Sequence, residues 1–291
     1  MVLVVGMKIA LVIPAYNEEE FLPVTLQSLA EQSRVIDKIV VVNDGSVDGT
    51  EMVCKTFSES YPQISYVTNI KKEKRASGSK VVRAFNLGLK LVDIEQFDLI
   101  AKIDSDIGFP ANYFETIIDE FQNNPKLGLC GGICTIEKNG EWVDEQVSNL
   151  DHVRGALKVY RVSAFRQMGG LRTIMGWDSI DEFLLRFYDW EVACDPELKV
   201  KHYRVTHSIN GWYKESVLNG EVFNNLGYNF LVAAISSAKR SLLKSPYIIT
   251  GLVSFMSYLK LRMSQPAKHL DKKQKAFVNR YRIRSIFKRF K

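Results

Sequence analysis

Residues 97–106 read Phe-Asp-Leu-Ile-Ala-Lys-Ile-Asp-Ser-Asp, a short apolar run that ends in two carboxylates one residue apart. Two earlier runs have the same form: residues 8–13 (Lys-Ile-Ala-Leu-Val-Ile), and residues 38–42 (Lys-Ile-Val-Val-Val), which precede Asn43 and Asp44. Continuous apolar runs of this length are typical of strands that are buried on both faces of a parallel sheet. We therefore expect three strands of one such sheet.

The segments between these runs have helical spacing of their apolar residues. They are residues 18–32, a segment that begins at Asp48-Gly49-Thr50, and residues 80–91. The alternation predicts an α/β fold. Ligands of such sheets bind at the carboxyl ends of the strands, where this chain places its acids. Further along, we expect a strand at 129–136, a strand and short helix within 155–170, a helix opening at 176–182, and a strand at 198–203.

Composition indicates an ordinary folded protein. The chain has 291 residues, 46% hydrophobic and 25% charged, which argues against disorder and allows one large domain with an appendage. Its four cysteines form no CxxC pair, so the simplest interpretation is a reduced, intracellular protein. The apolar N-terminus is interrupted by Lys8, which fits a buried strand better than a signal peptide, and Met7 is a possible true start.

The triplet Asp104-Ser105-Asp106 has the composition of a divalent-cation site. Mg²⁺ and Mn²⁺ prefer oxygen ligands, and such a cation can bridge two phosphates and stabilise a leaving diphosphate. A pair of acids one residue apart also arises by chance. The structural alternative is a turn with Asx capping before Phe109-Pro110.

The three strand ends together resemble the N-terminal signatures of family 2 glycosyltransferases, which have the GT-A fold. The matching segments are Val-Ile-Pro-Ala-Tyr-Asn-Glu (12–18), Val-Val-Asn-Asp-Gly-Ser-Val-Asp-Gly-Thr (41–50) and Ile-Asp-Ser-Asp (103–106). The resemblance covers about residues 7–210. It implies a GT-A-type α/β/α sandwich that binds a nucleotide sugar.

The resemblance also assigns roles to individual residues. Asp44 would accept a hydrogen bond from the base, or would be only a turn residue before Gly45. Asp104 and Ser105 would lie near the ribose, Asp104 also near the metal, and Asp106 would bind the Mn²⁺ or Mg²⁺ ion directly. Lining the nucleotide pocket would be Pro14, Ala15, Tyr16 and Glu18.

One signature departs from the family pattern. The family often has Gly-Lys before a helix with Asn-x-Gly, whereas this chain has Arg75-Ala-Ser-Gly78-Ser79-Lys80 before Asn86-Leu-Gly. A basic residue near the base or diphosphate is still expected, and both Arg75 and Lys80 are candidates. A solvated Lys80 at a helix start is the competing interpretation.

Two later residues complete the expected site. The segment Gly176-Trp-Asp-Ser-Ile-Asp-Glu182 resembles the family motif whose acid serves as general base towards the acceptor hydroxyl. We favour Asp181, with Asp178 and Glu182 as rivals, although acids also suit a first helical turn for dipole reasons. His202 is the candidate third metal ligand, and His207 is its alternative.

The resemblance implies an inverting glycosyltransferase. Its donor would be a nucleoside-diphosphate sugar, with UDP-sugar favoured, and its acceptor a saccharide or a lipid-linked hydroxyl in surface polysaccharide synthesis. Residues 137–155 and 171–182 would read the sugar and acceptor. A nucleotidyltransferase would instead carry a Gly-rich phosphate loop after the first strand, which is absent here. Asp181 argues against a third option, a binding module without activity.

The C-terminal third differs in character. Residues 247–259 are largely apolar but, as a helix of roughly 20 Å, fall short of the ~30 Å hydrocarbon core. Residues 260–291 hold twelve Lys or Arg and one acid, interleaved with aromatic and aliphatic residues. That pattern suits anionic lipid headgroups, and no nucleic-acid motif accompanies it. We expect a catalytic domain at 1–214 and a helical, basic amphipathic appendage at 215–291, in a cytoplasmic protein peripheral to the inner membrane face.

Overall fold

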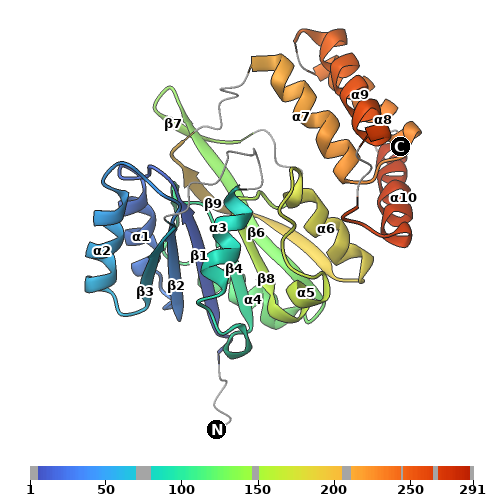
Figure 1. Cartoon of the computed structure of the whole chain (residues 1–291). Coiled ribbons are helices and arrows are strands. Elements are labelled where there is room, and N and C mark those ends of the chain that lie inside the picture. The colour runs from blue at the N-terminus through green and yellow to red at the C-terminus, as the bar shows by residue number, and fades with distance from the viewer. Residues whose placement is uncertain are drawn as a thin grey trace. The chain divides into compact units, whose positions relative to one another are not determined.

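The computed structural model describes residues 6–69, 80–145, 151–204, 211–243, 245–264 and 268–288, which form two compact units. The first unit comprises Met1–Ala76, Lys80–Leu171 and Tyr188–Val205; it contains a mixed sheet and its covering helices (Figure 1). The second comprises Ser77–Ser79, Arg172–Phe187 and Thr206–Lys291 and is helical in its described residues. The predicted α/β class with a helical C-terminal region is confirmed. The boundary after residue 214 stays a prediction.

The sheet of the first unit has nine strands among the described residues, in the order β3-β2-β1-β4-β8-β6-β9-β5, with β7 paired to β6. Three pairings of the N-terminal half are parallel: β1–β2, β1–β4 and β2–β3. The strands are β1 (Ile9–Ala15), β2 (Lys38–Asn43), β3 (Ile64–Thr68), β4 (Leu99–Ile103), β5 (Ile107–Gly108), β6 (Leu127–Lys138), β7 (Glu141–Asp144), β8 (Leu157–Arg161) and β9 (Glu191–His202).

The parallel arrangement predicted for β1, β2 and β4 is therefore confirmed. The rest of the sheet is mixed, because β8 pairs antiparallel to both β4 and β6, and β5 pairs antiparallel to β9. The antiparallel β5–β9 pair places Ile107 opposite His202. This register brings a residue from late in the chain to the end of β4.

Helices cover both faces of this sheet. They are α1 (Leu22–Ala30), α2 (Thr50–Ser60), α3 (Lys80–Leu89), the short 3₁₀ helix η1 (Ile94–Gln96), α4 (Tyr113–Asn123) and α5 (Val162–Gln167). Alternate residues of β1, such as Leu11, belong to one core cluster with residues of α1, α2 and α4. The opposite face packs on α3, where Phe85 also meets Phe165 of α5 edge to face. The result is the expected α/β/α sandwich.

Contact between α3 and the sheet is unusually close. A Cβ on Gly88 would lie 2.6 Å from side-chain atoms of both Val12 and Val42, nearer than real Cβ contacts come. Only glycine fits at this point of the helix. The packing fixes the position of α3, and with it Lys80 at the start of that helix.

The second unit consists of α6 (Trp177–Phe187), α7 (Gly211–Asn225), α8 (Phe230–Leu243), α9 (Tyr247–Ser264) and α10 (Lys272–Lys288). Helix α9 packs against α7 and α8, and Tyr258 donates a hydrogen bond to the carbonyl of Tyr228. Rings of α6 and α10 meet at Phe183 and Tyr281. In the described part of the chain, every helix is too short or too polar to cross a bilayer.

Candidate active site

The loops that follow β1 and β2 are joined by hydrogen bonds. The backbone N–H of Asn17, a residue with φ of 55°, donates to Ser46 Oγ at 2.9 Å, and the N–H of Val47 donates to Asn17 Oδ1 at 2.9 Å. The N–H of Glu18 donates to Thr50 Oγ1 at 2.8 Å. Because Asn tolerates the left-handed conformation, the chain can turn sharply here and hold Glu18 in a fixed place.

Two of the residues predicted to bind the nucleotide, Tyr16 and Lys80, lie next to each other. The Lys80 ammonium lies 5.3 Å from the centroid of the Tyr16 ring, within the range of a cation–π contact. Asp44 accepts a hydrogen bond from Asn69 Nδ2 at 2.8 Å. The Ala15 side chain is buried in the core, so a pocket would meet this residue through its backbone. The nucleotide roles themselves stay predictions, as does that of the half-buried Pro14.

Some predicted residues lie outside the described part of the chain. Arg75, with the Gly78-Ser79 pair, falls in residues 70–79, and His207 falls in residues 205–210. Their roles stay predictions.

At the end of β4, Asp104 is paired with a buried cation. The Lys102 ammonium contacts the Asp104 carboxylate and also donates to the carbonyl of Gly155 at 2.8 Å. The Lys102 side chain is only 2% exposed, whereas that of Asp104 is 34% exposed. Lys102 thus holds one side of the Asp104 carboxylate from beneath, while the rest remains accessible. A lysine within an otherwise apolar run was the sequence signal for this pair, which sequence reasoning missed.

The backbone carbonyl of Ser105 helps to hold the turn that follows β4. This carbonyl accepts a hydrogen bond from Thr25 Oγ1 at 2.8 Å, and the same hydroxyl oxygen accepts from the N–H of Ile107 at 3.0 Å. This clamp from α1 fixes the turn between β4 and β5. It explains how the two acids of the triplet keep their directions.

Asp106 and His202 are brought together, as the sequence analysis expected of two metal ligands. His202 Nε2 lies 3.5 Å from Asp106 Oδ2, and the N–H of Tyr203 donates to the Asp106 carbonyl at 3.0 Å. Burial disfavours the charged imidazolium, but the Asp106 carboxylate outweighs it and raises the pKa of His202 above 6.5. A negatively charged environment of this kind favours a cation beside the imidazole.

Glu18 joins the same acidic cluster. Burial raises the pKa of Glu18 from 4.5 to about 7. Its ion pair with Arg204, at 2.8 Å, lowers that pKa, while the charges of Asp106 and Asp104 raise it again. Carboxylates that repel one another in this way favour the binding of a cation among them. Arg204 was missed by sequence reasoning because no motif accompanies it.

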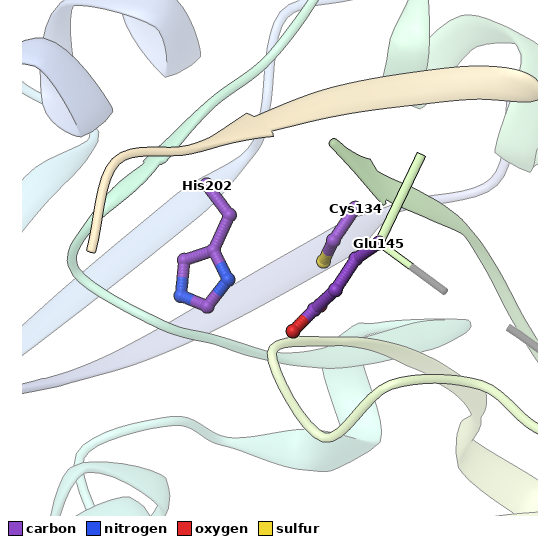
Figure 2. Close-up of side chains that lie close together, drawn as sticks. All are labelled: Cys134, Glu145 and His202. Carbon is purple, nitrogen blue, oxygen red and sulfur yellow. The ribbon is translucent and has the colours of Figure 1, made fainter. Parts of the chain in front are cut away.

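A third group of side chains borders His202. Figure 2 shows Cys134 and Glu145 directed towards the imidazole, and one ligand atom from each of the three residues lies within 4.8 Å of the others. Arg154 donates to Glu145 at 2.8 Å. Neither Cys134 nor Glu145 was predicted, since nothing in the sequence indicates that β6 and the residue after β7 meet β9 here.

These residues fit a divalent cation. Asp104 and Asp106 offer oxygen ligands, and His202 offers a ring nitrogen. Burial first, and then the neighbouring carboxylates, raise the pKa of Glu18 beside them. Carboxylates with one imidazole suit Mn²⁺, and Mg²⁺ with water completing its shell.

The favoured base lies in the second unit. Asp181 is on α6, is 2% exposed, and accepts a hydrogen bond from the N–H of Glu182 at 2.7 Å. Glu182 pairs with Arg186 at 3.3 Å, one turn later in the helix. The half-buried Asp178 stands in the first turn. Asp181 as the base therefore stays a prediction, and so do its two rivals.

Residues 10–170 match the family model described as Glycosyl transferase family 2. Minor teichoic acid biosynthesis protein GgaA of Bacillus subtilis is 30% identical over 123 residues, which are 41% of this chain and 26% of that protein. The first curated relatives are matched over only 16–53% of their own length.

Two solved structures share the fold. The mannosyltransferase PcManGT of Pyrobaculum calidifontis, in complex with GDP-Man and Mn²⁺, has a TM-score of 0.55 and 14% identity over 97% of this chain and 87% of that chain. Residues 1–349 of S. aureus TarS, in complex with UDP-GlcNAc, give a TM-score of 0.56 and 13% identity over 89% and 74%. At these identities the likeness concerns the fold alone, which is that of GT-A enzymes.

Proposed function

Because this chain belongs to glycosyl transferase family 2, we propose that it is an inverting glycosyltransferase. It would move a sugar from a nucleoside-diphosphate sugar to a hydroxyl of a saccharide or lipid-linked acceptor. Surface polysaccharide synthesis is the setting that we propose, and the similarity to a teichoic acid biosynthesis protein supports it. The observation that carries the proposal is the cluster of Glu18, Asp104, Asp106 and His202 at the carboxyl edge of the sheet.

Mn²⁺ or Mg²⁺ is the proposed cofactor, held by Asp106, Asp104 and His202. When bound, the ion stabilises the negative charge that develops on the leaving diphosphate. Lys102 keeps Asp104 oriented, and Thr25 keeps the turn in place, so that the ligands are positioned in advance. The ion pair between Glu18 and Arg204 offsets part of the negative charge at this edge of the sheet.

The nucleotide would lie over the ends of β1 and β2. Tyr16 is 36% exposed and offers a ring face, while Lys80 beside it offers a cation to the diphosphate. Asp44 would accept from the base, and Arg75 would be the second candidate cation. We favour a UDP-sugar, which is supported by the UDP-GlcNAc complex of TarS, whereas PcManGT binds GDP-Man.

Proton removal from the acceptor hydroxyl falls to Asp181 in this proposal. A carboxylate that takes the proton as the oxygen attacks the anomeric carbon makes a single displacement possible, with inversion. The hydrogen bond from the Glu182 N–H, at 2.7 Å, holds one oxygen of Asp181 in place. Asp178 and Glu182 are the competing candidates.

We further propose that the second unit rests on an anionic membrane surface. Along α9, five apolar side chains are more than half exposed: Tyr247, Ile248, Leu252, Met256 and Met263. A cavity of about 820 Å³ is bordered by the α7–α8 turn, the last part of α9 and α10. It is lined by four cationic residues, Arg262, Lys275, Arg280 and Arg284, and by no acid. Apolar side chains beside cations are the pattern of interfacial helices, in which lipid phosphates meet the cations.

The catalytic proposal is tested by incubating the protein with Mn²⁺, a panel of sugar nucleotides and saccharide acceptors. We expect release of a nucleoside diphosphate, with UDP-sugars preferred. Release of a sugar 1-phosphate, the leaving group when the nucleotidyl group itself is transferred, would indicate nucleotidyl transfer instead. Binding without turnover, unaffected by Asp181→Asn, would indicate a binding module.

The membrane proposal is tested by flotation with liposomes rich in anionic lipid. The variant carries Arg280→Glu and Arg284→Glu, and a matched control carries the same charge change at two exposed lysines of the first unit, Lys90 and Lys126. We expect the first variant to stay with the unbound fraction and the control to float. Equal flotation of both would contradict the proposal.

A further inference from the structure

Cys134, Glu145 and His202 form a compact group that the proposed transfer reaction does not use as a whole. Cys134 lies on β6, Glu145 directly follows β7, and His202 ends β9. One ligand atom of each lies within 4.8 Å of the other two. Cys134 and His202 are buried, and the Glu145 side chain is 11% exposed. Figure 2 shows the sulfur and the carboxylate facing the same edge of the imidazole ring.

The imidazole has a different neighbour on each side. Its Nε2 faces Asp106 Oδ2 at 3.5 Å, whereas its Nδ1 has no hydrogen-bond partner within the described ranges. His202 is 5% exposed, so water reaches its ring only poorly. A buried polar atom of this kind costs free energy unless water or an ion satisfies it. Nδ1 is directed towards Cys134 and Glu145.

This set of donors differs from that of the transfer site in one respect: the thiol of Cys134 takes the place of a second carboxylate. Thiolate, imidazole and carboxylate together are the ligands of Zn²⁺, whereas Mn²⁺ and Mg²⁺ favour oxygen. Burial raises the pKa of the Cys134 thiol, so the thiol carries its proton in the metal-free protein. Binding would therefore form the Zn–S bond and release the thiol proton to solvent. Arg154, now 2.8 Å from Glu145, would have to yield part of its ion pair.

We propose that Cys134, Glu145 and His202 Nδ1 form a second cation site, selective for Zn²⁺, that shares its imidazole with the transfer site. Zn²⁺ bound there pulls the ring away from the ion held by Asp106. Zn²⁺ therefore inhibits an enzyme that Mn²⁺ activates. The inhibition rests on the proposed transferase function, whereas the binding does not.

Binding is tested on the full chain with Co²⁺ as a spectroscopic stand-in for Zn²⁺. A thiolate bound to Co²⁺ gives a near-ultraviolet charge-transfer band, and we expect one equivalent of Co²⁺ to produce it and Zn²⁺ to abolish it. The band should vanish in Cys134→Ser and persist in Cys130→Ser, the matched control, which removes another buried thiol of the same strand. It should also persist in Asp106→Asn.

Glu145→Gln provides a second, milder variant, which should weaken Co²⁺ binding at least tenfold. Absence of the band in the folded wild-type protein, or its persistence in Cys134→Ser, would overturn the proposed site. Circular dichroism of each variant identifies any loss of folding.

Inhibition is tested separately, with Mn²⁺ saturating. We expect the Zn²⁺ concentration for half-inhibition to rise at least tenfold in Cys134→Ser relative to Cys130→Ser. Equal inhibition of the two variants would overturn the regulatory half of the proposal. If no sugar nucleotide is turned over at all, the transferase proposal fails, but the Co²⁺ band still decides the binding site.

Discussion

The Nε2 atom of His202 lies 3.5 Å from Oδ2 of Asp106, although the two residues are far apart in the chain. The antiparallel pairing of β5 with β9 creates this contact, because it sets Ile107 opposite His202. The contact makes His202, a residue of β9, part of the acidic edge formed by β1 and β4.

His202 should therefore matter to metal use more than to folding. We expect His202→Gln to lower the Mn²⁺-dependent release of nucleoside diphosphate about 10- to 100-fold, because one ligand is lost. The Mn²⁺ concentration for half-maximal activity should rise with it. His269→Gln, at an exposed histidine of the second unit, is the control and should leave both values unchanged. Equal effects of the two variants would argue against His202 as a ligand.

Glu18 should give the metal-free protein a distinctive pH dependence. Its pKa is about 7 in the folded protein against an ordinary 4.5, which corresponds to about 3 kcal/mol. The folded state keeps this proton when the unfolded state has lost it, so the stabilisation is complete below pH 4.5 and is lost as the pH rises through 7.

This dependence is measured by urea unfolding in EDTA between about pH 4 and about pH 8, a range that includes both pKa values. We expect the free energy of unfolding of Glu18→Gln to fall less over this range than that of the wild type. Parallel curves for the two proteins would show that Glu18 has an ordinary pKa.

Asp181 should affect the chemical step and spare donor binding. We expect Asp181→Asn to lower kcat by about 10²–10⁴-fold, the range of general base catalysis, without changing the Kd for the sugar nucleotide. The same measurements on Asp178→Asn and Glu182→Gln show which of the three acids is the base. A larger loss of kcat in either rival would transfer the role to it.

Gly88 tests the close packing of α3 on the sheet. Alanine normally favours a helix by up to about 1 kcal/mol over glycine, but here its Cβ would overlap Val12 and Val42. Overpacking of this kind costs about 1–3 kcal/mol, so we expect a net loss of stability. The midpoint of urea unfolding should fall in Gly88→Ala and stay constant in Lys55→Ala, at an exposed position of α2. A stabilised Gly88→Ala would contradict this packing.

The sequence predicted most of what lies along single strands. The apolar runs of β1, β2 and β4 predicted buried parallel strands, because nearly every residue of these strands is buried whichever face it points to. β3 escaped notice because it is an edge strand with half-buried side chains and so lacks a continuous apolar run. The first half of β9 was missed for the same reason, since its residues are half-buried or exposed.

Contacts between residues on different strands could not be predicted from the sequence. The pairs Lys102–Asp104 and Glu18–Arg204, and the group around Cys134, depend on which strands become neighbours. Hydrophobic periodicity identifies a strand but not its partner. The pairing of Asp106 with His202 was expected only through the family resemblance, and the roles of the nucleotide residues and of Asp181 still await experiment.

The most direct measurement is calorimetric titration of the protein with UDP and with GDP, in Mn²⁺ and in EDTA. We expect the better-bound nucleotide to lose at least tenfold in affinity when Mn²⁺ is removed, because the acids after β4 then repel the diphosphate. Asp106→Asn should show the weak affinity even with Mn²⁺, whereas Asp119→Asn, at an exposed acid of α4, should match the wild type. Equal affinity in Mn²⁺ and in EDTA, unchanged in Asp106→Asn, would show that no cation at Asp106 binds the diphosphate.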